Sequence, residues 1–131
     1  MKFLSLITFL LTSTASFAGG GGGGGASSPF IPLNPPIIVN IRDGIHIRHM
    51  QVIIEIKLTD PSKAPKVDLH KGPIRHELIL MLSSQEAGTI SSAKGKENLR
   101  KDALAAVQKV LQDLEGEPII EALYFTNFII Q

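Results

Sequence analysis

The chain has 131 residues, with 13 Lys or Arg against 12 Asp or Glu and a formal net charge of +1. So balanced a charge gives no long-range attraction to nucleic acid or anionic lipid, and few aromatic residues are available to stack on bases. The absence of cysteine excludes disulfide frameworks, thiolate zinc sites and thiol catalysis.

Residues 1–18 have the three-part pattern of a secretory signal. A positive charge at Lys2 precedes an apolar run over residues 3–11, and a polar stretch then ends in small residues. This order predicts export, with cleavage between Ala18 and Gly19. The alternative is a retained membrane anchor, although spanning a bilayer takes about 20 apolar residues and polar residues interrupt this run.

Residues 19–35 predict a flexible linker in front of the folded domain. Seven consecutive glycines, Gly19–Gly25, lead into a stretch punctuated by serine and proline. Such a composition cannot bury a core. The remaining residues, 36–131, suit one domain with a single hydrophobic core.

Two strands are predicted at the start of this domain, over residues 37–42 and 45–58. Asp43-Gly44 between them is typical of a tight hairpin turn. Alternate residues of the second strand are apolar, so one face of the sheet is expected to be covered. Asp60-Pro61 and Ala64-Pro65 then predict a loop, because proline cannot donate to a strand ladder.

Two amphipathic helices and a final strand follow. The first helix begins at Pro73 and ends near Ser83 or Ser84. The second has Ser91 or Ser92 as its N-cap and continues to Gly116, where a positive φ can end a helix. Residues 119–130 are rich in β-forming residues and predict a closing strand. The expected fold is α+β, in the order strand, strand, helix, helix, strand, with both helices on the apolar face of a small sheet.

No catalytic, cofactor or metal site is predicted. The glycine run matches a dinucleotide-binding pattern only trivially, because no strand precedes it and no helix follows it. His46 and His49 stand three apart on a predicted strand, which points them to opposite faces. With His70 and His76 they are expected to be ordinary surface histidines. No nucleophile elbow is found and the carboxylates are scattered, so we expect a protein that acts by contacts.

Three ordered segments carry a family resemblance. The first is Asn34-Pro35-Pro36-Ile37-Ile38-Val39-Asn40, and the second combines Leu82-Ser83-Ser84 with Gly95-Lys96-Glu97-Asn98-Leu99-Arg100. The third and most specific is the ending Tyr124-Phe125-Thr126-Asn127-Phe128-Ile129-Ile130-Gln131. Together they resemble the flagellar basal-body-associated FliL family. The resemblance implies a structural role for Pro36, Asn40, Ser83, Gly95, Leu99, Arg100, Phe125, Thr126, Phe128 and Gln131.

By this resemblance, the chain is expected to be a periplasmic domain with a fold like that of the stomatin and prohibitin family, and to assemble into rings. It would lie at the outer face of the inner membrane and contact flagellar stator and basal-body proteins. It would thereby influence rotation, swimming, swarming and chemotaxis, with no cofactor and no nucleic acid. Family members carry a membrane helix where this chain has a signal-like segment. That departure leaves a second hypothesis open, an exported binding module with the same fold that serves a non-flagellar envelope assembly.

Overall fold

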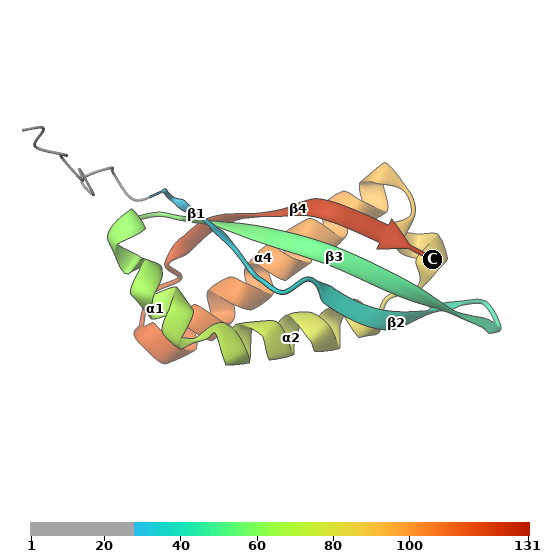
Figure 1. Ribbon diagram of the computed structural model, residues 1–131, viewed down its shortest axis with the longest axis horizontal. Helices are drawn as coiled ribbons and strands as arrows, with labels where there is room; N and C mark the ends of the chain where they lie inside the picture. Colours follow the sequence, from blue (N-terminus) through green and yellow to red (C-terminus); the bar gives the residue numbers. More distant parts are fainter. Residues whose placement is uncertain (1–27) are drawn as a thin grey trace, which may run out of the picture.

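The computed structural model describes residues 28–131, so the predicted signal, the Ala18-Gly19 cleavage site and the glycine run lie outside the described residues. Figure 1 shows the arrangement of the elements along the chain. In chain order they are β1 (Phe30–Pro32), β2 (Ile37–Asp43), β3 (His46–Leu58), a 3-10 helix (Pro61–Lys63), α1 (Ala64–Leu69), α2 (Lys71–Ser83), α3 (Ala87–Ile90), α4 (Ala93–Glu115) and β4 (Ile120–Ile130). The predicted α+β class is confirmed.

The long strand β3 is the centre of an antiparallel sheet. β4 pairs with residues 50–58 of β3, whereas β2 pairs with residues 46–52 and β1 with residues 55–57. Each residue of a strand has only two sides for pairing, so β1 and β2 lie end to end along one side of β3 and β4 lies along the other. The sheet therefore has one edge at β4 and the other at β1 and β2.

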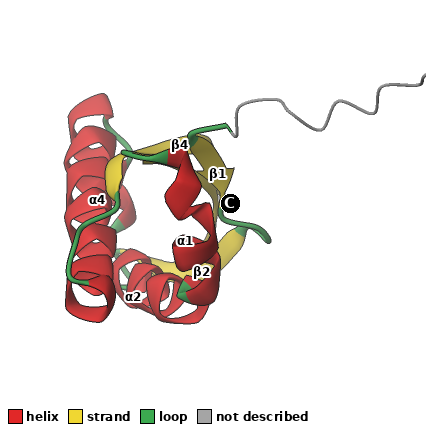
Figure 2. Ribbon diagram, turned by 90° about the vertical axis from the view of Figure 1, so that its left-hand side faces the viewer, coloured by secondary structure: helices red, strands yellow, loops and turns green. Residues whose placement is uncertain are grey.

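Helices α2 and α4 cover one face of this sheet (Figure 2). The residues of β3 on that face are at most 1% exposed, namely Met50, Val52, Ile54, Ile56 and Leu58. Opposite them lie the buried residues of the two helices, which are Ile74, Leu78, Leu82, Leu99, Ala103, Val107 and Leu111. The alternation predicted for β3 and the apolar stripes predicted for both helices are thus confirmed, except that Leu114, predicted as the last residue of the α4 stripe, is 50% exposed.

The turn and cap residues predicted from the sequence have the expected roles. Asp43 and His46 pair across a tight turn in which Gly44 has a φ of 62°. The hydroxyl of Ser92 caps α4 by accepting a hydrogen bond from the Gly95 N–H at 3.0 Å. Gly116, with a φ of 77°, ends the same helix. Both Gly44 and Gly116 adopt the left-handed conformation that costs glycine least.

The structure differs from prediction just before β2 and just after β3. The predicted linker extends to residue 35, but β1 pairs with β3 and Leu33 is buried in the core. A three-residue strand is too short for its alternation to be recognised among prolines. The predicted loop after β3 is instead a 3-10 helix followed by α1, because Pro61 and Pro65 each stand in a first helical turn, where the missing N–H is not needed. The short helix α3 is also additional.

Candidate functional site

A bulge in β4 decides which of its side chains face the helices. The pairing register shifts between Ile53 and Ile54 of β3, which leaves Thr126 out of the ladder. Residues three apart in a regular strand point to opposite faces, but this extra residue puts Phe125 and Phe128 on the same face. Their ring centroids lie 5.5 Å apart in an edge-to-face arrangement. The bulge therefore builds an aromatic pair at the border of the core.

The second half of β4 is an open edge of the sheet. Gln131 exchanges two backbone hydrogen bonds with His49, at 2.9 and 2.8 Å. Hydrogen-bonded pairs alternate with non-bonded pairs along an antiparallel ladder. The N–H and C=O groups of Phe128 and Ile130 consequently point away from β3, and no partner for them is found within residues 28–131.

Side chains of α4 occupy the same edge in the first half of β4. Arg100 Nη1 donates to the carbonyl of Leu123 at 3.2 Å, and Gln108 Nε2 donates to the carbonyl of Ile120 at 3.0 Å. Arg100 also donates from Nε and Nη2 to the two carboxylate oxygens of Glu97, at 2.8 and 2.5 Å. The hydrogen bonds from Arg100 hold the pKa of Glu97 below its ordinary value. Arg100 is therefore a fixed link between helix and strand.

Gly95 allows α4 to begin close against α3. A Cβ atom at this position would lie 1.9 Å from the carbonyl oxygen of Thr89 and 3.1 Å from the Cα of Ile90. Both are backbone atoms, so no side-chain rotation relieves the contact. Glycine therefore sets where the first turn of α4, and with it Lys96, lies relative to β4.

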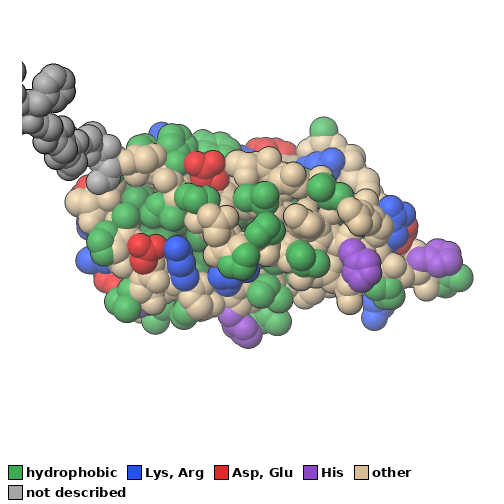
Figure 3. All heavy atoms as spheres, in the orientation of Figure 1, with side chains coloured by type: hydrophobic (Ala, Val, Ile, Leu, Met, Phe, Trp, Pro, Cys, Tyr) green, Lys and Arg blue, Asp and Glu red, His purple; other side chains and the backbone are tan. Residues whose placement is uncertain are grey.

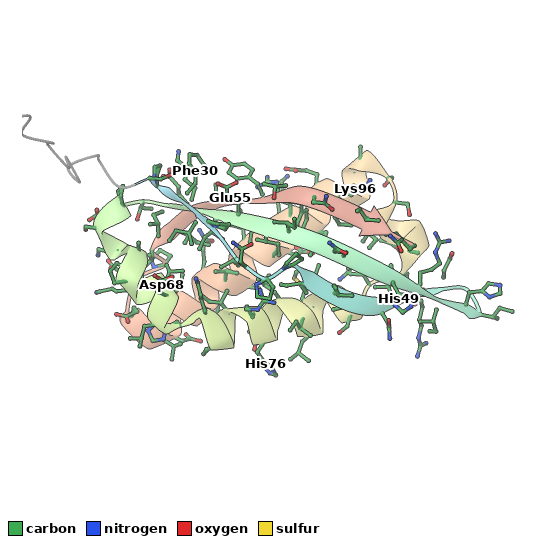
Figure 4. All side chains as sticks on the ribbon, in the orientation of Figure 1. Phe30, His49, Glu55, Asp68, His76 and Lys96 are labelled. Atoms are coloured by element: carbon green, nitrogen blue, oxygen red, sulfur yellow. The ribbon has the colours of Figure 1, made fainter. Side chains whose placement is uncertain are left out.

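A groove about 310 Å³ in volume lies between the first turns of α4 and the second half of β4. Its lining residues are Ala93, Lys96, Glu97, Arg100, Tyr124, Phe125 and Phe128. Figure 4 shows Lys96 beside the second half of β4. A second hollow adjoins the groove, since Lys96 and Phe128 line both, and it extends to α3 and the β2–β3 hairpin.

Lys96 is the cation of the groove that has no carboxylate partner. The two neighbouring arginines, Arg100 and Arg48, are each paired with a carboxylate, at 2.5 and 3.1 Å. Lys96 forms no ion pair with any residue between 28 and 131, and its Nζ lies 5.3 Å from the centroid of the Phe128 ring. That distance is within the range of a cation–π attraction. The groove thus offers one uncompensated positive charge beside aromatic surface.

The residues singled out by the family pattern fall into two groups. Those around the groove and the open edge are Gly95, Arg100, Phe125, Thr126, Phe128 and Gln131, while Leu99 is buried in the core. The other three are dispersed, since Pro36 precedes β2, Asn40 is exposed on β2, and the Ser83 hydroxyl donates to the Leu80 carbonyl at the end of α2. Sequence reasoning missed the role of Lys96, because one lysine among the charged residues of a helix start has no distinguishing signal.

The prediction of four ordinary surface histidines is wrong for His70. His46, His49 and His76 are exposed, but the side chain of His70 is only 16% exposed and its Nε2 lies 2.6 Å from Oε1 of Glu115. The end of α4 packs against the junction of α1 and α2, a long-range contact that local sequence does not reveal. The hydrogen bond from His70, with the nearby Lys66 ammonium, holds the pKa of Glu115 below its ordinary value.

The face of the sheet opposite the helices carries a mixture of apolar and charged side chains (Figure 3). Its exposed apolar residues include Phe30, Ile38, Ile47, Tyr124 and Ile129. They are interspersed with polar residues of β3, and the Nζ of Lys57 lies 6.0 Å from the centroid of the Phe30 ring. Scattered apolar residues of this kind are normal on a protein surface. The groove beside β4 is therefore the better defined candidate site.

Among residues 28–131, no cluster of three or more His, Cys, Asp or Glu side chains is placed to hold a metal ion. Within the same part of the chain, no helix combines the length and apolar character needed to cross a bilayer. What the described residues do present is a small α+β domain with a groove beside an open strand edge. Such surfaces are suited to binding other polypeptides.

The family described as "Flagellar basal body-associated protein FliL" matches residues 30–131, and the chain belongs to that family. The match begins at Phe30, the first residue of β1. The "Flagellar protein FliL" of Aquifex aeolicus (strain VF5) is 27% identical over 99 residues. The aligned part is 76% of this chain and 59% of that relative. The chain thus spans less than two thirds of the length of the relative.

Proposed function

We propose that the protein is a non-enzymatic, flagellar basal-body-associated protein that supports or modulates the stator and thereby flagellar rotation. The observation that carries this proposal is the family match, which covers every described helix and strand. The groove supports it physically, because aromatic rings, an uncompensated cation and an open strand edge are features of a contact surface.

The proposed organisation is a signal peptide over residues 1–18, a linker, and a FliL-like domain. Cleavage between Ala18 and Gly19 would release the domain into the periplasm, at the outer face of the inner membrane. The linker would end before Phe30, because β1 belongs to the folded domain. If residues 1–18 were instead retained as a membrane anchor, the glycine-rich linker would serve as the tether between the anchor and the domain.

The proposed partners are flagellar stator and basal-body proteins, together with further copies of this chain in a ring. The open second half of the β4 edge supports association, since an unpaired edge is a template for contact with another chain. The balanced charge supports partners other than nucleic acid.

Deletion of the gene tests this proposal. Swimming speed in viscous medium and swarm expansion are expected to fall, because both conditions place the motor under high load. The full-length gene is expected to restore both. A fluorescently tagged copy is expected at the flagellar base. Unchanged motility at every load, with the tagged copy in envelope complexes of cells that lack flagella, would instead favour a non-flagellar envelope assembly.

A further inference from the structure

We propose that the groove beside β4 binds an extended segment of a partner protein, which adds as a strand to the open edge and places an acidic side chain at Lys96. The inference rests on the proposed function in one respect only, which is that the partner would belong to the basal body. The binding mode itself follows from the edge, the aromatic rings and the unpaired cation.

The backbone of β4 supplies the first part of the recognition. The N–H and C=O groups of Phe128 and Ile130 point outward, and a strand laid along them would satisfy all four groups. Arg100 and Gln108 already occupy the edge at Leu123 and Ile120, so the added strand is confined to the second half of β4. The open stretch is therefore short and has a defined start.

Side chains of the groove supply the second part. Alternate residues of an added strand point to the same side, toward α4. Phe125 and Phe128, which face the helices, offer apolar surface to such residues. A neighbouring position would reach Lys96, which lines both the groove and its adjoining hollow. Apolar residues around one acidic residue are thus the expected pattern of the partner.

Charge selects an acidic partner over a basic one. Of the described residues that line the groove and its adjoining hollow, the acids are Asp43 and Glu97, and both are already paired, with Arg48 and Arg100, so a basic side chain would find no unpaired acid there. Lys96 has no such partner between residues 28 and 131, and a carboxylate on its ammonium would form a charge-assisted hydrogen bond.

The β2 edge of a second copy of this chain would fit the open edge of β4 less well than a segment of a different protein. In a second copy, the free side of β2 already forms a bridge between Arg42 and Glu86. A strand whose edge is partly covered cannot lie along another edge over its full length. Self-pairing through β4 and β2 is therefore an alternative that the experiment below has to exclude.

The test is a selection of phage-displayed random peptides on the intact exported protein. We expect enrichment of peptides with alternating apolar residues and Asp or Glu at one fixed position. Lys96→Glu is expected to replace that acidic preference with Lys or Arg, whereas Lys94→Glu, an equal charge change at an exposed position of the same helix outside the groove, is expected to keep it. Affinity for a selected acidic peptide should fall about tenfold in Lys96→Glu only.

Hydrogen exchange of the protein with the selected peptide locates the bound strand. We expect the bound peptide to slow exchange at the amides of Phe128 and Ile130 and to leave the exchange rates of the β2–β3 hairpin unchanged. No enrichment, protection elsewhere, or an acidic preference that survives Lys96→Glu would overturn the proposal. So would concentration-dependent dimers that protect the same amides without peptide. These measurements contain no motor component, so their failure is distinguishable from failure of the flagellar function, which motility alone decides.

Discussion

Substitution of Gly95 by alanine tests whether the start of α4 is held against α3 by a missing side chain. The added Cβ would lie 1.9 Å from the Thr89 carbonyl oxygen, whereas ordinary contacts begin near 3.4 Å. The helix start must therefore move by about 1.5 Å, the shortfall between these distances, which is strain of the kind that overpacking causes. We expect a cost of about 3 kcal/mol, the upper end for overpacking, offset by about 1 kcal/mol of helix propensity.

The net loss in the free energy of unfolding is then about 2 kcal/mol, or a fall in Tm of roughly 8–16 °C for a domain of this size. Urea and thermal unfolding followed by circular dichroism measure both quantities. Gly72→Ala is the matched control, because a Cβ there meets nothing within 4 Å. It is expected to leave stability unchanged or raise it by up to about 1 kcal/mol. A Gly95→Ala protein as stable as the wild type would refute the close approach.

Three further substitutions test other parts of the structure. Because the pKa of Glu115 is lowered in the folded state, its ionised carboxylate stabilises the fold at pH values above the ordinary carboxyl pKa of 4.5. This stabilisation is lost as the pH falls through the lower pKa of the folded state. The stability difference between wild type and Glu115→Gln in urea melts should therefore shrink on acidification, and a constant difference from pH 7 to pH 3 would contradict this. Gly116→Ala should lower the free energy of unfolding by about 1 kcal/mol, since alanine resists the left-handed conformation at the end of α4. An unchanged Tm in thermal melts would contradict this. Arg100→Lys should cost about 1 kcal/mol and speed hydrogen exchange in β4, because lysine cannot keep the contacts with both Glu97 and the Leu123 carbonyl; unchanged exchange would show that this link is dispensable.

Long regular patterns made most of the fold predictable from the sequence. The alternation along β3 identified its covered face, and the Ser92 cap and Gly116 together bounded α4. Both signals are local, because each depends on neighbouring residues in one element. Short elements gave no such signal. β1 and α3 have three and four residues, barely more than one period of a strand or a helix, so no repeat of the pattern can be recognised.

The groove could be predicted only in part. The family resemblance drew attention to Gly95, Arg100, Phe125 and Phe128, which the structure brings together. Their contact depends on α4 packing along β4, and the bulge at Thr126 leaves no mark in the sequence. Lys96 became a candidate only once its neighbours were known to be paired.

The central proposal is that this protein acts on the flagellar motor through the groove beside β4. The most direct measurement is swimming speed in viscous medium for cells whose own gene is replaced by Lys96→Glu or by Lys94→Glu, at matched protein levels. Lys94→Glu is expected to restore the parental speed, whereas Lys96→Glu is expected to swim like the deletion strain. Full restoration by Lys96→Glu, or a deletion strain that swims at the parental speed, would contradict the claim.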